Sequence, residues 1–483
     1  MLLTIRRLFF ILLFLGLFLM TLRPIADPDF WWHLRTGQLI AQTQAIPLTD
    51  PFSFTNTGKP WIAHEWLSEL LFYGLYNLGG YGLLIFSFSI LVTAAFLLTY
   101  LSCPRESRPY VAGFSLMLGA IATAPTWGVR PQMISLFFTS LFLYLLDRFW
   151  MEAKLKFVIP LPLLTLAWVN FHAGYFLGLG IVAIYIVGGG IELLKAKFQK
   201  TEPHAGSTLK PILVLCSVLV ISILTTLANP NGLQILLYPF QTLTSQAMQQ
   251  FILEWFSPDF HLFEWQPLAW FILALIGAGM LGRKTISPTK ILLTLIFGYA
   301  ALRSMRHVPL FAIVCIPILA EQISALVKID SGAKKSSLFL NWIAPFLLAS
   351  FVLLVALRFD QIVQRQPQSE INSFPKGAVD WIQENQPPGT LFNSYGWGGY
   401  IIWRLFPHYL VYIDGRADLY GDDFIYSYAQ IYHGQAGWQQ VLAAQFVNLV
   451  LVEPQSGLAN VLRQSSDWEI GFEDHISVLF DRK

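Results

Sequence analysis

The chain has 483 residues, of which 55% are hydrophobic and only 12% are charged, and its mean hydropathy is +0.54. Soluble domains carry about 25% charged residues, so this composition argues against an ordinary soluble protein and predicts a membrane protein. The net charge of +2 hides a segregation of charge, because residues 358–483 hold eight Lys/Arg and fourteen Asp/Glu, a net of −6. Nucleic acid is therefore not expected as a partner of that region.

Apolar segments long enough to span a membrane recur along the chain. A spanning helix needs roughly 20 mostly apolar residues, and we count about eleven candidates. They lie near residues 5–22, 80–101, 110–126, 131–147, 156–171, 174–193, 211–228, 267–282, 289–302, 307–327 and 337–357. No small-x-small cleavage site follows the first of them, so we interpret residues 1–22 as an uncleaved first helix rather than a signal peptide.

The short loops predict the orientation of these helices, because cytoplasmic loops carry an excess of Lys and Arg. If the N-terminus is cytoplasmic, every inner loop is basic. The inner basic residues are Arg6, Arg7, Arg105, Arg108, Arg148, Lys154, Lys156, Lys195, Lys197, Lys200, Lys210, Arg283, Lys284, Lys290, Lys328, Lys334 and Lys335. We therefore expect a multi-pass protein of the plasma (inner) membrane, with the first loop, residues 23–79, and the C-terminal residues 358–483 on the outer face.

Histidines and isolated arginines gather in the expected outer loops. These loops are 23–79, a turn with Arg130, a turn with Asn170 and His172, the long loop 229–266, and a turn with Arg303, Arg306 and His307. Ionisable residues at membrane depth are costly and usually functional. This pattern predicts a cavity that opens to the outer face.

The C-terminal region changes in composition. Short apolar runs at 390–394, 409–414, 446–453 and 475–480 alternate with helical stretches at 378–385, 423–432 and 437–445. This alternation predicts a small α/β domain. The expected fold is therefore a multi-pass α-helical membrane domain, residues 1–357, followed by a small extracytoplasmic α/β domain, residues 358–483.

The first loop opens with the motif Asp27-Pro-Asp29. Proline suits a first helical turn and Asp27 is a good N-cap, so one interpretation is simply a capped helix start. Asp29 and His33 are four residues apart and share a helix face. A carboxylate in this setting could also act as a general base or a metal ligand. Trp31 and Trp32 fit an aromatic belt at the membrane interface.

The segment that begins at His64 predicts an amphipathic helix leading into the second span. Glu65 and Glu69 share one face of it, and we expect Glu69 to face solvent or headgroups. His64 and Glu65 fit a surface role and a substrate-binding role equally well. Together with the two first-loop aspartates, they could ligate a divalent cation, Mg or Mn, although nothing in the pattern requires a cofactor.

The outer arginines Arg130, Arg303 and Arg306 suggest phosphate binding, because a guanidinium matches phosphate oxygens bidentately. A lone arginine would instead snorkel to the headgroups. Because His172 and His307 lie in the same set of expected outer loops, the pattern favours a phosphate-binding pocket.

Two segments of the C-terminal region leave alternatives open. Residues 393–400, Asn-Ser-Tyr-Gly-Trp-Gly-Gly-Tyr, fit a strand-to-helix turn or a loop over the cavity whose glycines let a ligand approach the backbone. The motif Asp414-Gly-Arg416-Ala-Asp418 fits a site for sugar hydroxyls or an internal salt bridge.

These features resemble the GT-C class of membrane glycosyltransferases. Asp27-Pro-Asp29-Phe with His33 and Arg35 is similar to the first-loop motif of the oligosaccharyltransferase catalytic subunit, and the class also includes protein O-mannosyltransferases. Residues 380–387 and 394–401 are similar to a helix and a Trp-Trp-Asp-Tyr-Gly region of that subunit. Trp397 stands where that motif carries an acid, at a position that recognises the acceptor hydroxyl of a glycosylation sequon in the family.

The resemblance implies glycosyl transfer on the outer face, from a polyprenyl-phosphate-linked sugar to a glycan, lipid or protein acceptor. In this interpretation Asp27 or Asp29 is the general base, and Arg130, Arg303, Arg306 and His307 bind the donor phosphate. The expected substrate-binding residues are His33, Arg35, His64, Glu65, His172, Trp397, Tyr400, Asp414 and Arg416. The alternative is a non-catalytic membrane protein for lipid or polysaccharide transport or assembly, although transporters usually place their charges near the midplane of two related halves.

Overall fold

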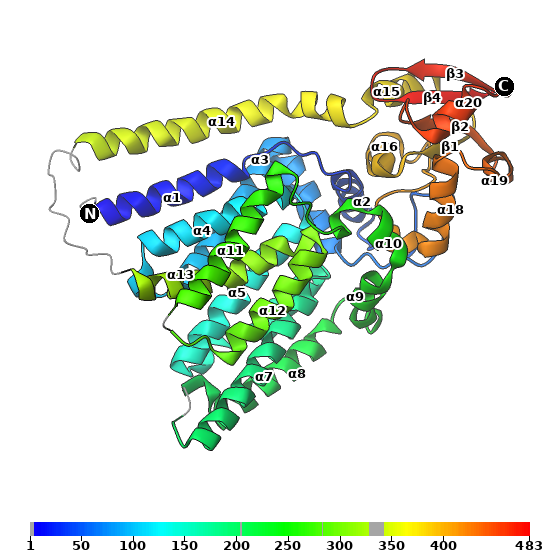
Figure 1. The fold of residues 1–483 in the computed structure, drawn as a ribbon. Helices are drawn as coiled ribbons and strands as arrows, with labels where there is room; N and C mark the ends of the chain where they lie inside the picture. The colour runs from blue at the N-terminus through cyan, green and yellow to red at the C-terminus, as the bar shows by residue number, and fades with distance from the viewer. Residues whose placement is uncertain (1–3, 203–204, 283, 328–341) are drawn as a thin grey trace. The chain divides into compact units, whose positions relative to one another are not determined.

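The computed structural model describes residues 4–202, 205–282, 284–327 and 342–483 (Figure 1). The chain folds into two compact units. Unit 1 comprises Met1–Arg23, Ile85–Leu233 and Leu253–Ile362, and unit 2 comprises Pro24–Leu84, Gln234–Ile252 and Val363–Lys483. The C-terminal residues thus form one body with most of the first loop and with the middle of the loop 229–266.

Unit 1 is built from apolar helices. They are α1 (Ile5–Thr21), α4 (Tyr110–Thr123), α5 (Pro131–Glu152), α6 (Leu161–Phe171), α7 (Tyr175–Gln199), α8 (Leu209–Thr226), α11 (Gln266–Leu281), α12 (Pro288–Arg303) and α13 (Val308–Leu326). Two further helices, α3 (Trp66–Ser102) and α14 (Ala344–Ser373), run from one unit into the other along the chain. The core of the unit surrounds α13, which is buried along most of its length and packs on α4, α5, α11 and α12.

Helices occupy the eleven predicted spanning ranges, but their lengths differ. In the described part of the chain, seven helical segments are long and apolar enough to cross a membrane, and two shorter apolar segments are Tyr110–Thr126 and Leu155–Phe171. Helix α1, with 17 residues, is at the lower limit of the usual spanning length, and α12, with 16, falls below it. The count of eleven and the orientation therefore stay predictions. Residues 337–341 of the last span lie outside the described residues, as do Arg283, Lys328, Lys334 and Lys335.

Unit 2 combines short helices with one sheet. Its helices are α2 (Phe30–Thr43), α9 (Gln234–Thr244), α10 (Gln246–Phe251), α15 (Lys376–Asn385), α16 (Gly398–Leu405), α17 (Ala417–Tyr420), α18 (Asp422–Tyr432), α19 (Trp438–Ala444) and α20 (Gly457–Leu462). Its strands are β1 (Thr390–Asn393), β2 (Val447–Val452), β3 (Trp468–Glu473) and β4 (Val478–Arg482). The predicted helices at 378–385, 423–432 and 437–445 correspond to α15, α18 and α19, so the α/β character is confirmed.

The sheet has the order β1-β2-β4-β3, with β1 parallel to β2 and the other two pairs antiparallel. The central strand β2 is almost wholly buried because it is apolar on both faces. Val450 pairs with Phe392 on one side and with Phe480 on the other. The sheet thus holds β1 and β2 in place, and loops of the unit begin at the ends of these two strands.

The predicted strand at 409–414 is wrong. Only Val411 makes isolated bridges, to Ser53 and to Leu391. The backbone of this segment is instead bonded to the first loop and to a side chain: the Val411 amide donates to the Phe52 carbonyl at 3.0 Å, and the Tyr412 amide donates to Asn393 Oδ1 at 2.9 Å. These partners satisfy the backbone groups that a strand ladder would have used.

Helix α2 begins two residues later than the sequence suggested, and Asp27 is not its N-cap. Asp29 holds the N-cap position, and the Asp27 carboxylate accepts the Asp29 amide at 3.0 Å. The predicted aromatic belt is also wrong, since Trp31 and Trp32 are 0% and 5% exposed. Trp31 packs edge-on against Tyr400, with ring centroids 5.1 Å apart, because α2 and α16 pack together within the unit.

Candidate functional site

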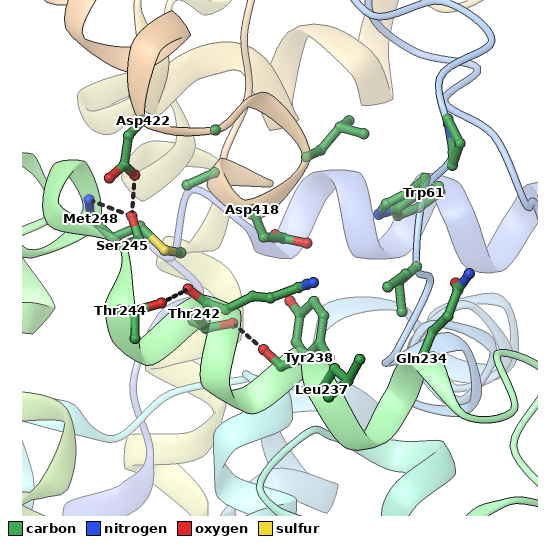
Figure 2. Close-up of a pocket in the computed structure, with 16 residues that line it drawn as sticks. Trp61, Gln234, Leu237, Tyr238, Thr242, Thr244, Ser245, Met248, Asp418 and Asp422 are labelled. Carbon is green, nitrogen blue, oxygen red and sulfur yellow. Dashed lines mark hydrogen bonds between the residues drawn. The ribbon is translucent and has the colours of Figure 1, made fainter.

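Unit 2 contains a cavity of about 690 Å³ (Figure 2). Three segments wall it: residues 60–62 of the first loop, helices α9 and α10 with the turn between them, and residues 417–422. This volume lies within the roughly 300–1,000 Å³ that small-molecule sites usually have. One wall comes from the first loop, and the others come from the long loop 229–266 and from the segment that begins in the Asp414–Asp418 motif. The described lining of this cavity contains none of the histidines and arginines that the predicted cavity was expected to gather.

The cavity wall mixes hydrogen-bonding groups with apolar surface. The polar lining residues are Gln234, Tyr238, Gln241, Thr242, Thr244, Ser245, Asp418 and Asp422. Trp61, Leu237 and Met248 are among the apolar ones. Such a wall combines a few placed polar groups with apolar contact area, as ligand sites do.

Asp422 ties two of the three walls together. Its carboxylate accepts the Ser245 hydroxyl at 2.6 Å and the Gln246 amide at 2.9 Å. The same hydroxyl oxygen of Ser245 accepts the Met248 amide at 3.1 Å, which makes Ser245 the N-cap of α10. Because both carboxylate oxygens are used, the turn between α9 and α10 is fixed to the start of α18.

Asp418 lies on the cavity wall opposite Tyr238 (Figure 2). Burial raises the pKa of Asp418, although His64, Tyr238 and Arg416 all act to lower it. Burial and the carboxylates of Asp418 and Glu65 raise the pKa of the Tyr238 hydroxyl well above its usual value, so this hydroxyl stays protonated.

A chain of histidines and glutamates leads from Tyr238 into the interior of the unit. The Tyr238 hydroxyl lies 3.3 Å from His64 Nε2, and that nitrogen lies 3.3 Å from Glu65 Oε1. Glu65 Oε2 lies 3.3 Å from His33 Nε2, and His33 Nδ1 lies 3.5 Å from Glu69 Oε1. The structure thus brings His33, His64 and Glu65 together, although none of the three lines the cavity, and their substrate-binding role stays a prediction. The expected solvent-facing position of Glu69 is wrong, because that residue is 1% exposed.

The surroundings of His64 fix its protonation. Its Nδ1 lies 3.2 Å from the Ile62 carbonyl, which can only accept, and its Nε2 faces the Glu65 carboxylate. The carbonyl and the carboxylate both favour the imidazolium, in which each ring nitrogen can donate. Burial lowers the pKa of His64, but Glu65 and Asp418 outweigh burial, so the pKa lies above its usual value.

The predicted base candidates Asp27 and Asp29 lie at the start of α2 and are partly buried. Asp29 Oδ1 accepts Trp32 Nε1 at 3.2 Å. The backbone of Gly415 comes so close that a Cβ there would lie 1.7 Å from Asp29 Oδ1. Asp29 thus touches the segment that carries Asp418, although neither first-loop aspartate lines the cavity.

The predicted cation ligands do not form a metal site. Among the described residues, no group of three or more His, Cys, Asp or Glu side chains is placed to hold a metal ion. His64 and Glu65 contact each other, and Asp27 accepts a backbone amide at the helix start. This arrangement does not fit the expected Mg or Mn site, so the reaction proposed below contains no metal-bound step.

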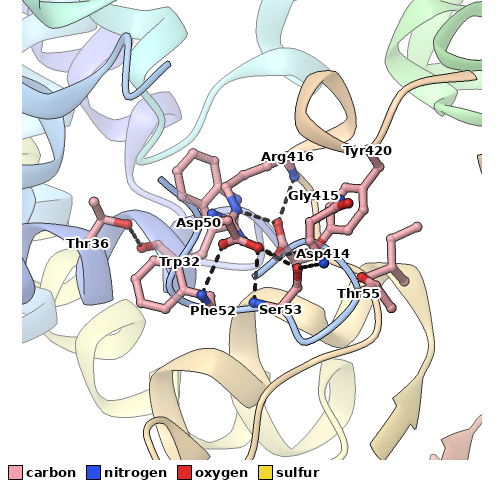
Figure 3. A network of polar contacts seen from close by, with 12 residues as sticks. Trp32, Thr36, Asp50, Phe52, Ser53, Thr55, Asp414, Gly415, Arg416 and Tyr420 are labelled. Carbon is pink, nitrogen blue, oxygen red and sulfur yellow. Dashed lines mark hydrogen bonds and ion pairs between the residues drawn. The ribbon is translucent and has the colours of Figure 1, made fainter. Parts of the chain in front are cut away.

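Arg416 is the centre of a second, fully buried network (Figure 3). Its Nε donates to Asp414 Oδ1 at 2.8 Å, and its Nη2 lies 2.6 Å from Asp414 Oδ2 and 2.8 Å from Asp50 Oδ1. The Tyr420 hydroxyl donates to Asp414 Oδ2 at 2.8 Å. Of the two alternatives for Asp414 and Arg416, the structure therefore selects the internal salt bridge.

The network also positions the cavity wall. The Arg416 guanidinium lies 4.6 Å from the centroid of the Trp61 ring and 5.1 Å from that of Phe52. Asp50, which the sequence analysis missed, accepts the Phe52 amide at 3.0 Å and the Ser53 amide at 3.2 Å. The Asp-Pro-Phe-Ser sequence at 50–53 signals such a turn, but nothing local indicates its arginine partner.

Arg35, Trp397 and Tyr400, predicted to bind substrate, do not line the cavity. Arg35 donates to the Phe406 carbonyl at 2.6 Å. The Tyr400 hydroxyl donates to Glu370 at 2.7 Å and accepts from Arg404 at 2.8 Å, and Trp397 is buried at the start of α16. These three residues hold the unit together.

The glycine-rich segment 393–400 is the predicted strand-to-helix turn between β1 and α16. A Cβ at Gly398 would lie 2.3 Å from the Ile413 carbonyl oxygen, and one at Gly399 would lie 2.5 Å from the Pro28 carbonyl oxygen. The space at Gly398 and Gly399 is therefore filled by protein backbone, whereas Ser394, Tyr395 and Gly396 line a separate cavity of about 250 Å³.

Unit 1 gathers most of the predicted phosphate-binding residues around the segment 253–257. Arg130 forms an ion pair with Glu254, and the Arg306 guanidinium lies 5.1 Å from the centroid of the Trp255 ring. His307 also packs edge-on against Trp255, at 6.2 Å, while Arg303 is exposed on the neighbouring turn. Burial raises the pKa of Glu254, but Arg130 and Arg306 outweigh burial and lower it. Glu254 was not predicted, and it is the ion-pair partner of Arg130.

His172 has a structural role within unit 1. It is 8% exposed, and its Nδ1 accepts the Gly174 amide at 2.8 Å. The Ser135 hydroxyl lies 2.7 Å from the same nitrogen and accepts Trp168 Nε1 at 2.7 Å. These bonds fix the turn between α6 and α7, so the predicted substrate-binding role of His172 gains no support.

No protein-family model and no curated protein matches the chain. Among solved structures, it is similar to the oligosaccharyltransferase AglB from Archaeoglobus fulgidus, in complex with an inhibitory peptide and a dolichol-phosphate, at 13% identity and a TM-score of 0.55, over 92% of this chain and 69% of that one. ArnT from Cupriavidus metallidurans, bound to undecaprenyl phosphate, gives 11% identity and a TM-score of 0.48, over 97% of this chain and 96% of that one. The arabinofuranosyltransferase AftD from Mycobacteria gives 12% identity and a TM-score of 0.48, over 100% of this chain and 40% of that one.

The likeness to AglB confirms the predicted resemblance to GT-C membrane glycosyltransferases at the level of the fold. Together with the apolar helices, it identifies the chain as a multi-pass membrane protein with a small C-terminal sheet.

Proposed function

We propose that this chain is a membrane glycosyltransferase that moves a sugar from a polyprenyl-phosphate donor to an acceptor on the outer face of the plasma membrane. The observation that carries the proposal is the cavity of unit 2, which joins a polar wall to a chain of titratable side chains in a fold like that of AglB. AglB was solved with a dolichol-phosphate, which supports a lipid phosphate as the carrier here.

In the proposed reaction, an acceptor hydroxyl oxygen attacks the anomeric carbon of the donor sugar. The bond from that carbon to the phosphate oxygen breaks, polyprenyl phosphate leaves, and the hydroxyl proton passes to a carboxylate base. Asp29 is the proposed base and Asp27 the second candidate, because both belong to the first loop and Asp29 contacts the segment that carries Asp418. A positioned base of this kind contributes about 10²–10⁴-fold to a rate.

The proposed role of Arg130, Arg303 and Arg306 is to stabilise the departing phosphate. The observation behind this role is that Arg130 pairs with Glu254 while the Arg306 guanidinium lies on the ring of the adjacent Trp255. Arginine offers planar, bidentate donors to phosphate oxygens, and such donors stabilise charge that develops on a leaving group.

The proposal is tested in cells that carry the gene for the chain, by comparing extracellular glycans and glycolipids after substitution. Asp29→Asn, and separately Asp27→Asn, are compared with Asp259→Asn, an exposed aspartate that pairs only with exposed His261 in the described structure. Loss of a glycan in an aspartate variant at normal protein level, with no loss in Asp259→Asn, supports the transferase. A glycan profile unchanged in both first-loop variants favours the alternative of a transport or assembly protein.

A further inference from the structure

We infer that the cavity of unit 2 is the acceptor site and that the acceptor is a carbohydrate, one hydroxyl of which donates to Asp418. The inference rests on the proposed function and names the class of its second substrate.

The charges of the lining exclude the donor phosphate from this cavity. Of the described residues that line it, none is Lys or Arg, whereas Asp418 and Asp422 are both acidic. A phosphate placed here would meet like charge and no cation, which is unfavourable in a partly buried site. The guanidinium cluster that suits a phosphate belongs to unit 1, around Glu254. A neutral ligand fits the cavity better.

The kind of hydrogen-bonding groups favours hydroxyls. Gln234, Gln241 and Thr242 offer both donors and acceptors along α9, and a sugar hydroxyl both donates and accepts. Trp61, Leu237 and Met248 add apolar surface that can face the C–H side of a sugar ring. Trp61 is held in place by the Arg416 guanidinium on its ring, so this surface is preorganised.

Asp418 has acceptor capacity left for a ligand. A carboxylate has about four lone-pair sites, and Asp418 faces Tyr238 at the cavity wall (Figure 2). The Tyr238 hydroxyl itself lies 3.3 Å from His64 Nε2. Asp418 thus lies on the cavity wall with acceptor sites that a sugar hydroxyl can use. Asp422 has less acceptor capacity left than Asp418, because its two oxygens already accept from Ser245 and Gln246.

The test measures binding to the full-length chain in lipid nanodiscs. The probes are an array of neutral oligosaccharides, a matched set of Ser-, Thr- and Asn-containing peptides, and fluorescent undecaprenyl phosphate. We expect the chain to retain a subset of the oligosaccharides. Asp418→Asn should weaken this binding at least tenfold, and Thr242→Trp, which fills the cavity, should abolish it. Asp423→Asn, an exposed neighbour on α18, should bind as the unaltered chain does.

A second measurement needs no variant. Bound oligosaccharide should protect Met248, which lines the cavity, from oxidative footprinting in the unaltered chain. Retention of peptides but no oligosaccharide, oligosaccharide binding that Thr242→Trp leaves intact, or no protection of Met248 would each overturn the inference. Undecaprenyl phosphate reports on the proposed function separately: if the chain binds oligosaccharide but no lipid phosphate, the donor assignment fails while the carbohydrate site stands.

Discussion

Replacing Arg416 by methionine removes the only cation that pairs with Asp50 and Asp414 in the described structure, while keeping an apolar stem of similar length. Arg416 is 2% exposed, and both carboxylates are 2% exposed or less. Removing one partner of such a buried pair costs about 3–5 kcal/mol, because it leaves an uncompensated buried charge. Here two carboxylates lose their partner, so we expect the upper part of this range.

The assay is thermal unfolding of the detergent-solubilised chain, followed by tryptophan emission, since Trp61 lies against the Arg416 guanidinium. For a domain of about 150–250 residues, each kcal/mol shifts the midpoint by about 2–4 °C, so a loss of about 4–5 kcal/mol should make the variant unfold roughly 8–20 °C lower. The matched control is Arg463→Met, which breaks an exposed pair with Glu473 worth about 0–1 kcal/mol. If both variants unfold at the same temperature, the Arg416 network does not organise the cavity wall.

Two further predictions concern the same unit. The pKa of His64 is raised by Glu65 and Asp418 against burial, so its contribution to stability is full below the unfolded pKa of about 6.5 and is lost as pH rises through the folded pKa. In the unaltered chain, the unfolding temperature should therefore decrease as the pH rises through the folded-state pKa of His64. It should change less with pH in His64→Gln, and parallel pH profiles of the two proteins would contradict this. Gly398→Ala should cost about 1–3 kcal/mol by overpacking against the Ile413 carbonyl, whereas Gly396→Ala, with no atom within 4 Å of its Cβ position, should be neutral in the same unfolding assay.

The sequence predicted those parts of the fold that depend on local pattern. Apolar runs marked the helices of unit 1, and the alternation of helical stretches with short apolar runs marked α15, α18 and α19. The prediction of a strand at 409–414 was wrong because the hydrogen-bond partners of this segment, Phe52 and Asn393, are distant in the chain. Trp31 was misplaced for a similar reason, since burial against Tyr400 depends on how α2 meets α16.

The candidate site was predicted in part. The first loop supplied His33, His64 and Glu65, and the structure brings them together. Tyr238 was missed because it lies in an apolar stretch with no chemical signature, and only the fold places its hydroxyl beside His64. Asp414 and Asp418 are four residues apart in one motif, yet Asp414 is buried against Arg416 while Asp418 lines the cavity. No spacing rule separates those two roles.

The central claim is tested most directly by reconstitution. The purified chain is placed in liposomes with undecaprenyl-phosphate-linked radiolabelled sugars and a crude glycan acceptor fraction, and label transfer is measured with release of undecaprenyl phosphate. The account predicts transfer of at least one sugar with equal release of lipid phosphate, and a loss of about 10²-fold or more in Asp29→Asn or Asp27→Asn. Transfer that persists unchanged in both variants would contradict the proposed base, and no transfer of any sugar would contradict the enzyme.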